Sequence, residues 1–341
     1  MVSLKPEELA QGQTVSGNFL LVEKKLLPFT NKSGKYLSVK LRNKTGMILG
    51  KLWDAGEEAF SQLEGGSIVE VAGIVRTFNN EYELHLESIR QTNKPVVPEE
   101  FLPVAENIEE IKQDFLETLG WVKDMVSEPY ASLVDEVFQG SFGEKFYQAP
   151  AAVKYHHAYL GGLMEHTANV TVNSYNLAAR YRHADKTLVL LGALFHDIGK
   201  VEELAYEATF DYTSEGILLG HILQGSMMLK DALKNLEAEG IEIPREFANL
   251  LLHIITSHHG YLEWGSPKQP AIFEASIVHY ADMLDADACK YWEEEVEEGK
   301  SIWSNKLKKF IYGRRGIDEV SSLQEMEAEN VVFEDEDDIP F

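Results

Sequence analysis

Histidine and aspartate residues recur in the C-terminal two thirds of the chain, within segments that are apolar or rich in small residues. The adjacent pair His196-Asp197 ends the apolar run 190–195 and is followed by Lys200. An imidazole beside a carboxylate can bind one metal ion or two neighbouring ions, and neither group is soft enough to require zinc. Similar settings hold His166, His221, His258, His259 and Asp282. Burying so many titratable groups without a cation is costly, so the set predicts a metal centre.

Two periodicities indicate the elements that must position these residues. Residues 188–195 are apolar on nearly every side, as a central helix is, and the pattern from about 108 to 310 is helical. Residues 13–91 instead alternate with a period of two; between 37 and 41 the odd positions are apolar. Turn signals separate about five short strands, the size of an OB-type barrel. A small barrel of another topology fits nearly as well.

The chain is therefore expected to be a multi-domain protein, with a small all-β barrel followed by an all-α domain. We place an OB-type nucleic-acid-binding domain at 1–92 and a proline-rich linker at 93–107, where three prolines oppose helix and central strand. The helical domain spans 108–315. Residues 316–341 form an acidic tail, low in apolar content, which we expect to be disordered.

Charge and cysteine content bound the class of protein. The formal net charge is -25, yet residues 1–95 hold 12 Lys or Arg against 11 Asp or Glu, whereas 317–341 hold ten acids and no base. The acidity is thus local and does not exclude a nucleic-acid partner. Cys289 is the single cysteine, which excludes an internal disulfide and fits a reducing compartment. With no apolar run of about 18 residues, we expect a cytoplasmic protein without membrane association.

The barrel carries the mixture of cations and aromatic rings that single-strand binders use for stacking bases beside a basic groove. The alternative is that each residue is ordinary surface or core, and only the collective pattern favours binding. The candidate nucleic-acid-binding residues are Lys24, Lys25, Phe29, Lys35, Tyr36, Lys40, Arg42, Trp53, Arg76 and Phe78. We assign His85, His183 and His253 to packing.

The order His, His-Asp, His, His-His, Asp resembles the HD-domain phosphohydrolase superfamily, in the version that can hold two metals. The segments that carry the resemblance are 155–166, 195–200, 220–221, 257–260 and 279–282. More closely, the whole chain is similar to the YhaM-type 3′-to-5′ exoribonucleases, which join an OB-like domain to an HD domain. The helical domain would then be an HD domain.

The resemblance implies that His166, His196, Asp197 and Asp282 bind one metal, with Asp197 able to bridge. A second site would comprise His221, His258 and His259. The implied ion is Mn²⁺, with Co²⁺, Fe²⁺, Mg²⁺ and Zn²⁺ as alternatives.

Other residues near these motifs could serve in catalysis, in ligand support or in packing. Asp197 and Lys200 are catalytic candidates, with Lys200 either neutralising a phosphate oxygen or lying as a solvated helix-end lysine. The resemblance places His156 and His157 near the substrate as further catalytic candidates, where they would contact a phosphate or donate a proton; alternatively they form a packing corner. We regard His279 as structural, Glu165 as a ligand-supporting or exposed residue, and Asp285 and Asp287 as weaker ligand candidates.

The predicted function is a metal-dependent 3′-to-5′ exoribonuclease acting on single-stranded RNA, and in a broader version also on single-stranded DNA. The direction of digestion and a homo-oligomeric state are implied by the resemblance alone. One alternative is an HD phosphohydrolase of nucleotides or cyclic dinucleotides, although residues 260–267 depart from the Gly-Tyr-Pro pattern of the cyclic-dinucleotide branch. Another is a non-catalytic DNA- or RNA-binding regulator.

The C-terminal part of the sequence holds two further features. A basic cluster at 306–315 either extends the nucleic-acid path or caps the last helix. The chain then ends in Asp337, Asp338, Ile339, Pro340 and Phe341, which resembles the acidic tip of bacterial single-stranded DNA-binding proteins. An apolar anchor with a free carboxylate suits a basic-rimmed pocket, on a partner protein or in the groove of the chain's own barrel. The alternative is an acidic solubilising tail.

Overall fold

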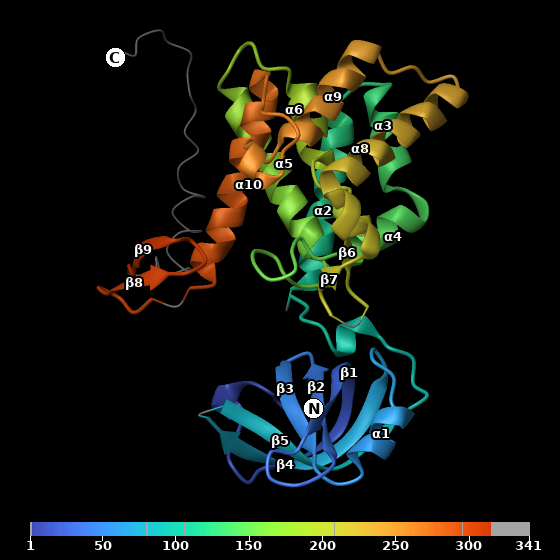
Figure 1. The fold of residues 1–341 in the computed structure, drawn as a ribbon. Helices are drawn as coiled ribbons and strands as arrows, with labels where there is room; N and C mark the ends of the chain where they lie inside the picture. Colours follow the sequence, from blue (N-terminus) through green and yellow to red (C-terminus); the bar gives the residue numbers. More distant parts are fainter. Residues whose placement is uncertain (1, 80, 106, 208, 295, 315–341) are drawn as a thin grey trace. The chain divides into compact units, whose positions relative to one another are not determined.

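The computed structural model describes residues 2–79, 81–105, 107–207, 209–294 and 296–314 (Figure 1). It separates into two compact units, Met1–Cys289 and Lys290–Phe341. The tail residues from Asp337 to Phe341 lie outside the described residues. Among the helices that the structure describes, none combines the length and apolar character that a membrane crossing requires.

Five strands near the N-terminus form a closed barrel in the order β1-β2-β3-β5-β4. Strands β3 and β5 pair in parallel and the other neighbours pair antiparallel, which confirms the OB-type barrel. The short helix α1 (Gly56–Gln62) follows β3 and was not expected from the strand pattern. The strands are β1 (Thr14–Pro28), β2 (Lys35–Asn43), β3 (Gly46–Leu52), β4 (Ile68–Phe78) and β5 (Glu81–Gln91).

The two-residue alternation decides which side of β2 faces the barrel interior. Leu37, Val39 and Leu41 are buried, whereas Lys40 is exposed. Each buried aliphatic side chain contributes roughly 1.5 to 3 kcal/mol relative to an exposed one, so a shift of one residue in register would lose several such contributions.

The described residues between 108 and 292 are mainly helical, as Figure 1 shows. Its helices are α2 (Ile108–Met125), α3 (Tyr130–Phe138), α4 (Gly140–Gln148), α5 (Gly162–Ala179), α6 (Lys186–Phe195), α7 (Lys200–Glu203), α8 (Ser214–Ala238), α9 (Arg245–Ser257) and α10 (Phe273–Trp292). A two-residue pair of strands, β6 (Leu204–Ala205) and β7 (Asp211–Tyr212), lies between α7 and α8. Short 3₁₀ turns are η1 (Pro6–Glu8), η2 (Pro98–Glu100) and η3 (Leu262–Trp264).

Helix α6 lies at the centre of the helical core and carries the His-Asp pair at its end. Its N-terminus is capped by Asp185, whose carboxylate accepts a hydrogen bond from the Leu188 amide at 3.1 Å. All residues from 188 to 195 are buried, in agreement with the apolar run in the sequence. Because packed neighbours hold α6 on every side, the two residues that follow it are delivered to a fixed position.

The end of the predicted helical domain differs from the sequence expectation. Helix α10 ends at Trp292, and an antiparallel hairpin of β8 (Ser301–Ser304) and β9 (Lys309–Tyr312) follows it, so the end of the predicted all-α segment is not helical. Residues 306–314 of the basic cluster lie on this hairpin and directly after it rather than at the end of a helix. In the proline-rich linker, Phe101 and Leu102 are buried, so the described residues around them pack as a strap.

Candidate metal centre

Five separate elements bring the predicted ligands together. His166 lies on α5, the pair His196-Asp197 follows α6, and His221 lies on α8 next to the backbone kink at Gly220. The doublet His258-His259 follows α9, and Asp282 lies on α10. The side chains of His166, His196 and His258 are fully buried.

Asp197 stands between two groups of imidazoles. Its Oδ2 atom lies 3.3 Å from Nε2 of His166 and 3.2 Å from Nε2 of His196. Its Oδ1 atom lies 3.5 Å from Nε2 of both His221 and His258. The Oδ1 atom of Asp282 lies 3.3 Å from Nε2 of His166, on the Oδ2 side. One carboxylate thus faces both halves of the predicted ligand set.

Each of these imidazoles uses its Nδ1 atom to hold its orientation. His196 and His258 donate to the carbonyls of Ala193 and Ile255, at 2.7 and 2.8 Å. His221 lies 3.0 Å from the Glu203 carboxylate. His259 donates to the Trp264 carbonyl at 2.9 Å, and His166 to Asp285 Oδ2 at 2.7 Å. Such bonds fix the tautomer of a metal-binding histidine and leave Nε2 for the metal.

Asp285 is an orienting residue in this geometry. Its Oδ2 atom accepts hydrogen bonds from His166 and, at 2.9 Å, from His157 Nε2, while its Oδ1 atom accepts from Asn169 at 2.9 Å. The Nδ1 atom of His157 is engaged too, 2.7 Å from the Tyr159 hydroxyl. With both ring nitrogens of His157 occupied, the packing alternative is favoured over proton donation to a substrate.

Lys200 is buried rather than solvated. Its Nζ atom lies 2.6 Å from Asp197 Oδ2. Gly199, the residue before Lys200, lets the backbone of α8 come close. A Cβ atom at position 199 would lie 2.0 Å from the His221 carbonyl and 2.5 Å from the Gly225 amide nitrogen. The absence of a side chain at 199 therefore lets α7 and α8 bring Asp197 and His221 together.

The protonation states follow from burial and from these pairings. Burial alone would raise the pKa of the Asp197 carboxyl, but Lys200 and His196 lower it well below the usual range. Burial would also lower the pKa of His166, but Asp197, Asp282 and Asp285 raise it well above its ordinary value. Burial lowers the pKa of His258 to about 3. At neutral pH, the His258 ring is therefore uncharged and its Nε2 atom offers a lone pair.

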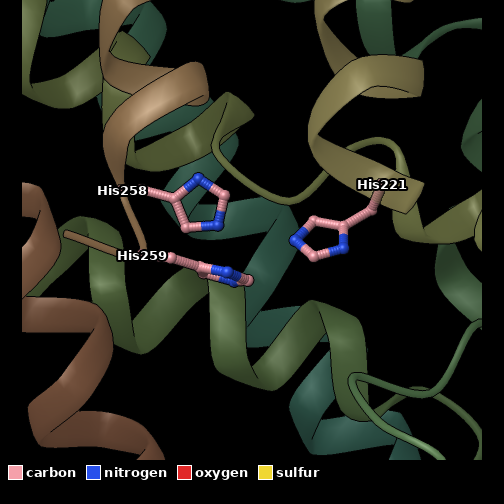
Figure 2. A group of neighbouring side chains, drawn as sticks. All are labelled: His221, His258 and His259. Atoms are coloured by element: carbon pink, nitrogen blue, oxygen red, sulfur yellow. The ribbon is translucent and has the colours of Figure 1, made fainter. Parts of the chain in front are cut away.

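Three buried acceptors at this centre fit a bound cation. Within the described residues, Asp197 Oδ1, His221 Nε2 and His258 Nε2 have no hydrogen-bond partner. Ligand atoms of His221, His258 and His259 lie within 4.8 Å of one another, as do those of His166, His196 and Asp197. Figure 2 shows the rings of His258 and His259 turned toward that of His221. Lone pairs converging in a buried space are unfavourable unless an electrophile lies between them, so these residues suit a metal.

The second candidate site is a cavity of about 460 Å³ on the barrel. It gathers five of the ten predicted nucleic-acid-binding residues: Phe29, Tyr36, Trp53, Arg76 and Phe78. The Tyr36 and Trp53 rings lie 4.6 Å apart, and those of Phe29 and Trp53 are stacked at 6.0 Å. This cluster, the barrel pocket, offers aromatic faces of the kind on which bases stack.

The other predicted cations of the barrel lie outside this pocket. Lys24 donates to the carbonyls of Phe60, at 2.8 Å, and Leu63, so its ammonium is engaged within the chain. Lys25 and Lys40 both pair with Glu23. Arg42 is half-buried, and Lys35 is exposed at the start of β2.

Sequence reasoning missed several members of the two sites. Lys51 and His85 line the barrel pocket; His85, assigned to packing, lies 2.7 Å from Glu83, which also pairs with Lys51 at 2.5 Å. The signal was available, because Lys51 and Trp53 share one face at a spacing of two residues. Glu203, the partner of His221, carries no comparable signal, because its contact depends on how two helices pack.

Comparisons with known proteins agree with both domains. Residues 163–287 match the model of the HD domain, and residues 20–92 match that of the OB-fold nucleic acid binding domain. The chain is 33% identical over 280 residues to the 3′-5′ exoribonuclease YhaM of Bacillus licheniformis, a match that covers 79% of this chain and 83% of that protein.

Two solved structures are similar to parts of the chain. The second OB-fold domain of replication protein A from Methanococcus maripaludis is 25% identical, over 28% of this chain and 99% of that one, with a TM-score of 0.23. The HD domain of the L. monocytogenes phosphodiesterase PgpH is 17% identical, over 47% of this chain and 76% of that one, with a TM-score of 0.25. At these TM-scores neither structure shows the family of the chain. The sequence match over most of both chains does, and the chain belongs to the family of YhaM-type 3′-5′ exoribonucleases.

Proposed function

We propose that this protein is a metal-dependent exoribonuclease that binds single-stranded RNA on its barrel and hydrolyses phosphodiester bonds from the 3′ end at the centre around Asp197. The observation that carries the proposal is the position of Asp197. Its Oδ2 atom faces His166 and His196, and its Oδ1 atom faces His221 and His258. A carboxylate with imidazoles on both sides would suit two neighbouring divalent ions, which in phosphodiester hydrolysis stabilise the attacking and leaving oxygens.

The donor set favours Mn²⁺, with Co²⁺, Fe²⁺, Mg²⁺ and Zn²⁺ as alternatives to be tested. Imidazoles and carboxylates without a thiolate suit these ions, and Cys289, whose sulfur accepts a hydrogen bond from the His157 amide at 3.3 Å, is not among the ligands. When bound, divalent ions activate water and stabilise charge on the phosphodiester oxygens. Lys200 keeps a fixed positive charge beside Asp197, where it can neutralise a phosphate oxygen.

The barrel pocket supports single-strand binding. Stacking on Tyr36 and Trp53 recognises the faces of bases, which every nucleotide has, and so tolerates any sequence. Arg76, an exposed residue that lines the same pocket, adds positive charge, whereas the ammonium of Lys51 is paired with Glu83. Because stacking does not read the 2′-hydroxyl, we extend the proposal to single-stranded DNA as a second substrate.

The test uses 5′-labelled single-stranded RNA and DNA of one sequence, incubated with the protein and Mn²⁺. A ladder that shortens from the 3′ end is expected with the wild type and not with Asp197→Ala. The matched control is Asp231→Ala, which removes an exposed carboxylate that pairs with Lys234. Cutting that survives Asp197→Ala would refute the assignment of the centre. Binding without cutting by the wild type would favour a regulator. If the wild type neither binds nor cuts either strand, small nucleotides become the substrates to test.

A further inference from the structure

The turn that follows the metal-binding histidines presents large side chains that neither the metal centre nor the barrel pocket requires. Tyr261, Leu262 and Trp264 are 45%, 60% and 53% exposed. Contiguous exposed apolar side chains commonly mark a surface that binds something. We call residues 261 to 264 the aromatic turn.

The aromatic turn is held in one shape by its own backbone. The Trp264 amide donates to the Tyr261 carbonyl at 3.1 Å, and the Ser266 amide donates to the same carbonyl at 3.2 Å. The rings of Tyr261 and Trp264 meet edge to face, with centroids 4.8 Å apart. A ligand that stacks on a surface already ordered loses less free energy to immobilising side chains.

The aromatic turn is also tied directly to the metal centre. The Tyr261 amide donates to the His259 carbonyl at 2.9 Å, and the His259 ring donates to the Trp264 carbonyl at 2.9 Å. Behind the turn, the His279 ring donates to the His258 carbonyl at 2.7 Å. Gly260, at φ +78°, leaves room for that ring, because a Cβ atom there would lie 2.3 Å from it. The two exposed rings are therefore fixed within a few residues of the histidines shown in Figure 2.

We infer that Tyr261 and Trp264 form a subsite for the bases of the 3′-terminal nucleotides, whose phosphodiester lies at the metal centre. This inference rests on the proposed function. The turn offers two aromatic faces, and its charged residue Glu263 is an exposed carboxylate that repels phosphate. Its chemistry therefore suits bases rather than the strand backbone. An enzyme that removes successive nucleotides needs recognition that tolerates every base, which stacking supplies.

The experiment compares two RNAs of equal length, one intact and one with its two 3′-terminal nucleotides abasic. For the wild type, KM should be lower for the intact strand. Stacking contributes about 1 to 3 kcal/mol per base, or about 5- to 150-fold. In the double variant Tyr261→Ala with Trp264→Ala, KM for the intact strand should rise at least about fivefold. KM for the abasic strand should hardly change, so the ratio of the two approaches one.

Two further variants keep the result interpretable. Leu262→Ala removes an exposed side chain of the same turn without an aromatic face and should leave the KM ratio as in the wild type. Tyr261→Phe with Trp264→Phe should largely restore the ratio, which settles the question if the alanine variant binds Mn²⁺ poorly. A KM ratio unchanged in the alanine variant would overturn the inference. The inference would also be overturned if the alanine variant changed its oligomeric mass, measured by size exclusion with light scattering, while its KM ratio stayed the same. Failure of the wild type to shorten intact RNA would instead overturn the proposed function.

Discussion

The substitution Asp285→Asn tests whether the carboxylate that accepts a hydrogen bond from His166 controls the metal affinity of the centre. Asp285 Oδ2 accepts hydrogen bonds from His166 at 2.7 Å and from His157 at 2.9 Å. A hydrogen bond to a charged group contributes roughly 1.5 to 3 kcal/mol, against roughly 0.5 to 1.5 kcal/mol for a neutral pair. Asparagine has nearly the same shape and keeps one acceptor, so each bond is weakened by about 1 kcal/mol. Together they weaken the network of His157, Asp285 and His166, which holds the His166 ring in place, by about 2 kcal/mol.

About 2 kcal/mol corresponds to an affinity for Mn²⁺ roughly 30-fold weaker, within the range of about 10- to 100-fold observed when such supporting residues are changed. Isothermal titration of the metal-free protein with Mn²⁺ measures this directly. Asp231→Asn, which alters an exposed carboxylate on α8, is the control and should bind as the wild type does. If folded Asp285→Asn protein binds Mn²⁺ with wild-type affinity, the orienting role assigned to this carboxylate is wrong.

Three further predictions concern packing, metal and the barrel. Gly199→Ala should lower the free energy of unfolding by about 1 to 3 kcal/mol in urea titrations, because its Cβ atom would lie 2.0 Å from the His221 carbonyl. The control Gly120→Ala, which has open space around it, should not destabilise the protein. Equal stabilities of the two variants would contradict this packing argument. Mn²⁺ at about 100 times its Kd should stabilise the protein by about 2.7 kcal/mol, seen as a raised Tm that a chelator reverses, and an unmoved Tm would argue against the centre. Trp53→Ala should weaken single-stranded RNA binding by about 1 to 3 kcal/mol in fluorescence anisotropy, because Trp53 offers a stacking face beside Tyr36 in the barrel pocket. Lys25→Ala, which removes a partner of Glu23, should have a small effect. A larger loss of affinity in Lys25→Ala than in Trp53→Ala would exclude the barrel pocket as the RNA-binding site.

The barrel shows which features of a fold a local sequence pattern can predict. Alternation over 37–41 identified β2 and its buried face, because successive side chains on a strand point to opposite sides. The same pattern could not distinguish the OB order from another small barrel, since strand order depends on pairings such as that of β3 with β5. It also missed α1, whose seven residues are too few for a clear helical period.

The metal centre likewise combines features that the sequence indicates with features that depend on packing. The sequence by itself predicted which histidines and aspartates could bind metal, because their residue types and order are properties of the chain. Only the tertiary structure decided that Asp285 orients His166, a contact across 119 residues, and that Lys200 is buried against Asp197. Hydrogen bonds and burial at such separations depend on how α5, α6, α8 and α10 pack. No local periodicity encodes that packing, whereas the ligand types are present in the sequence before the chain folds.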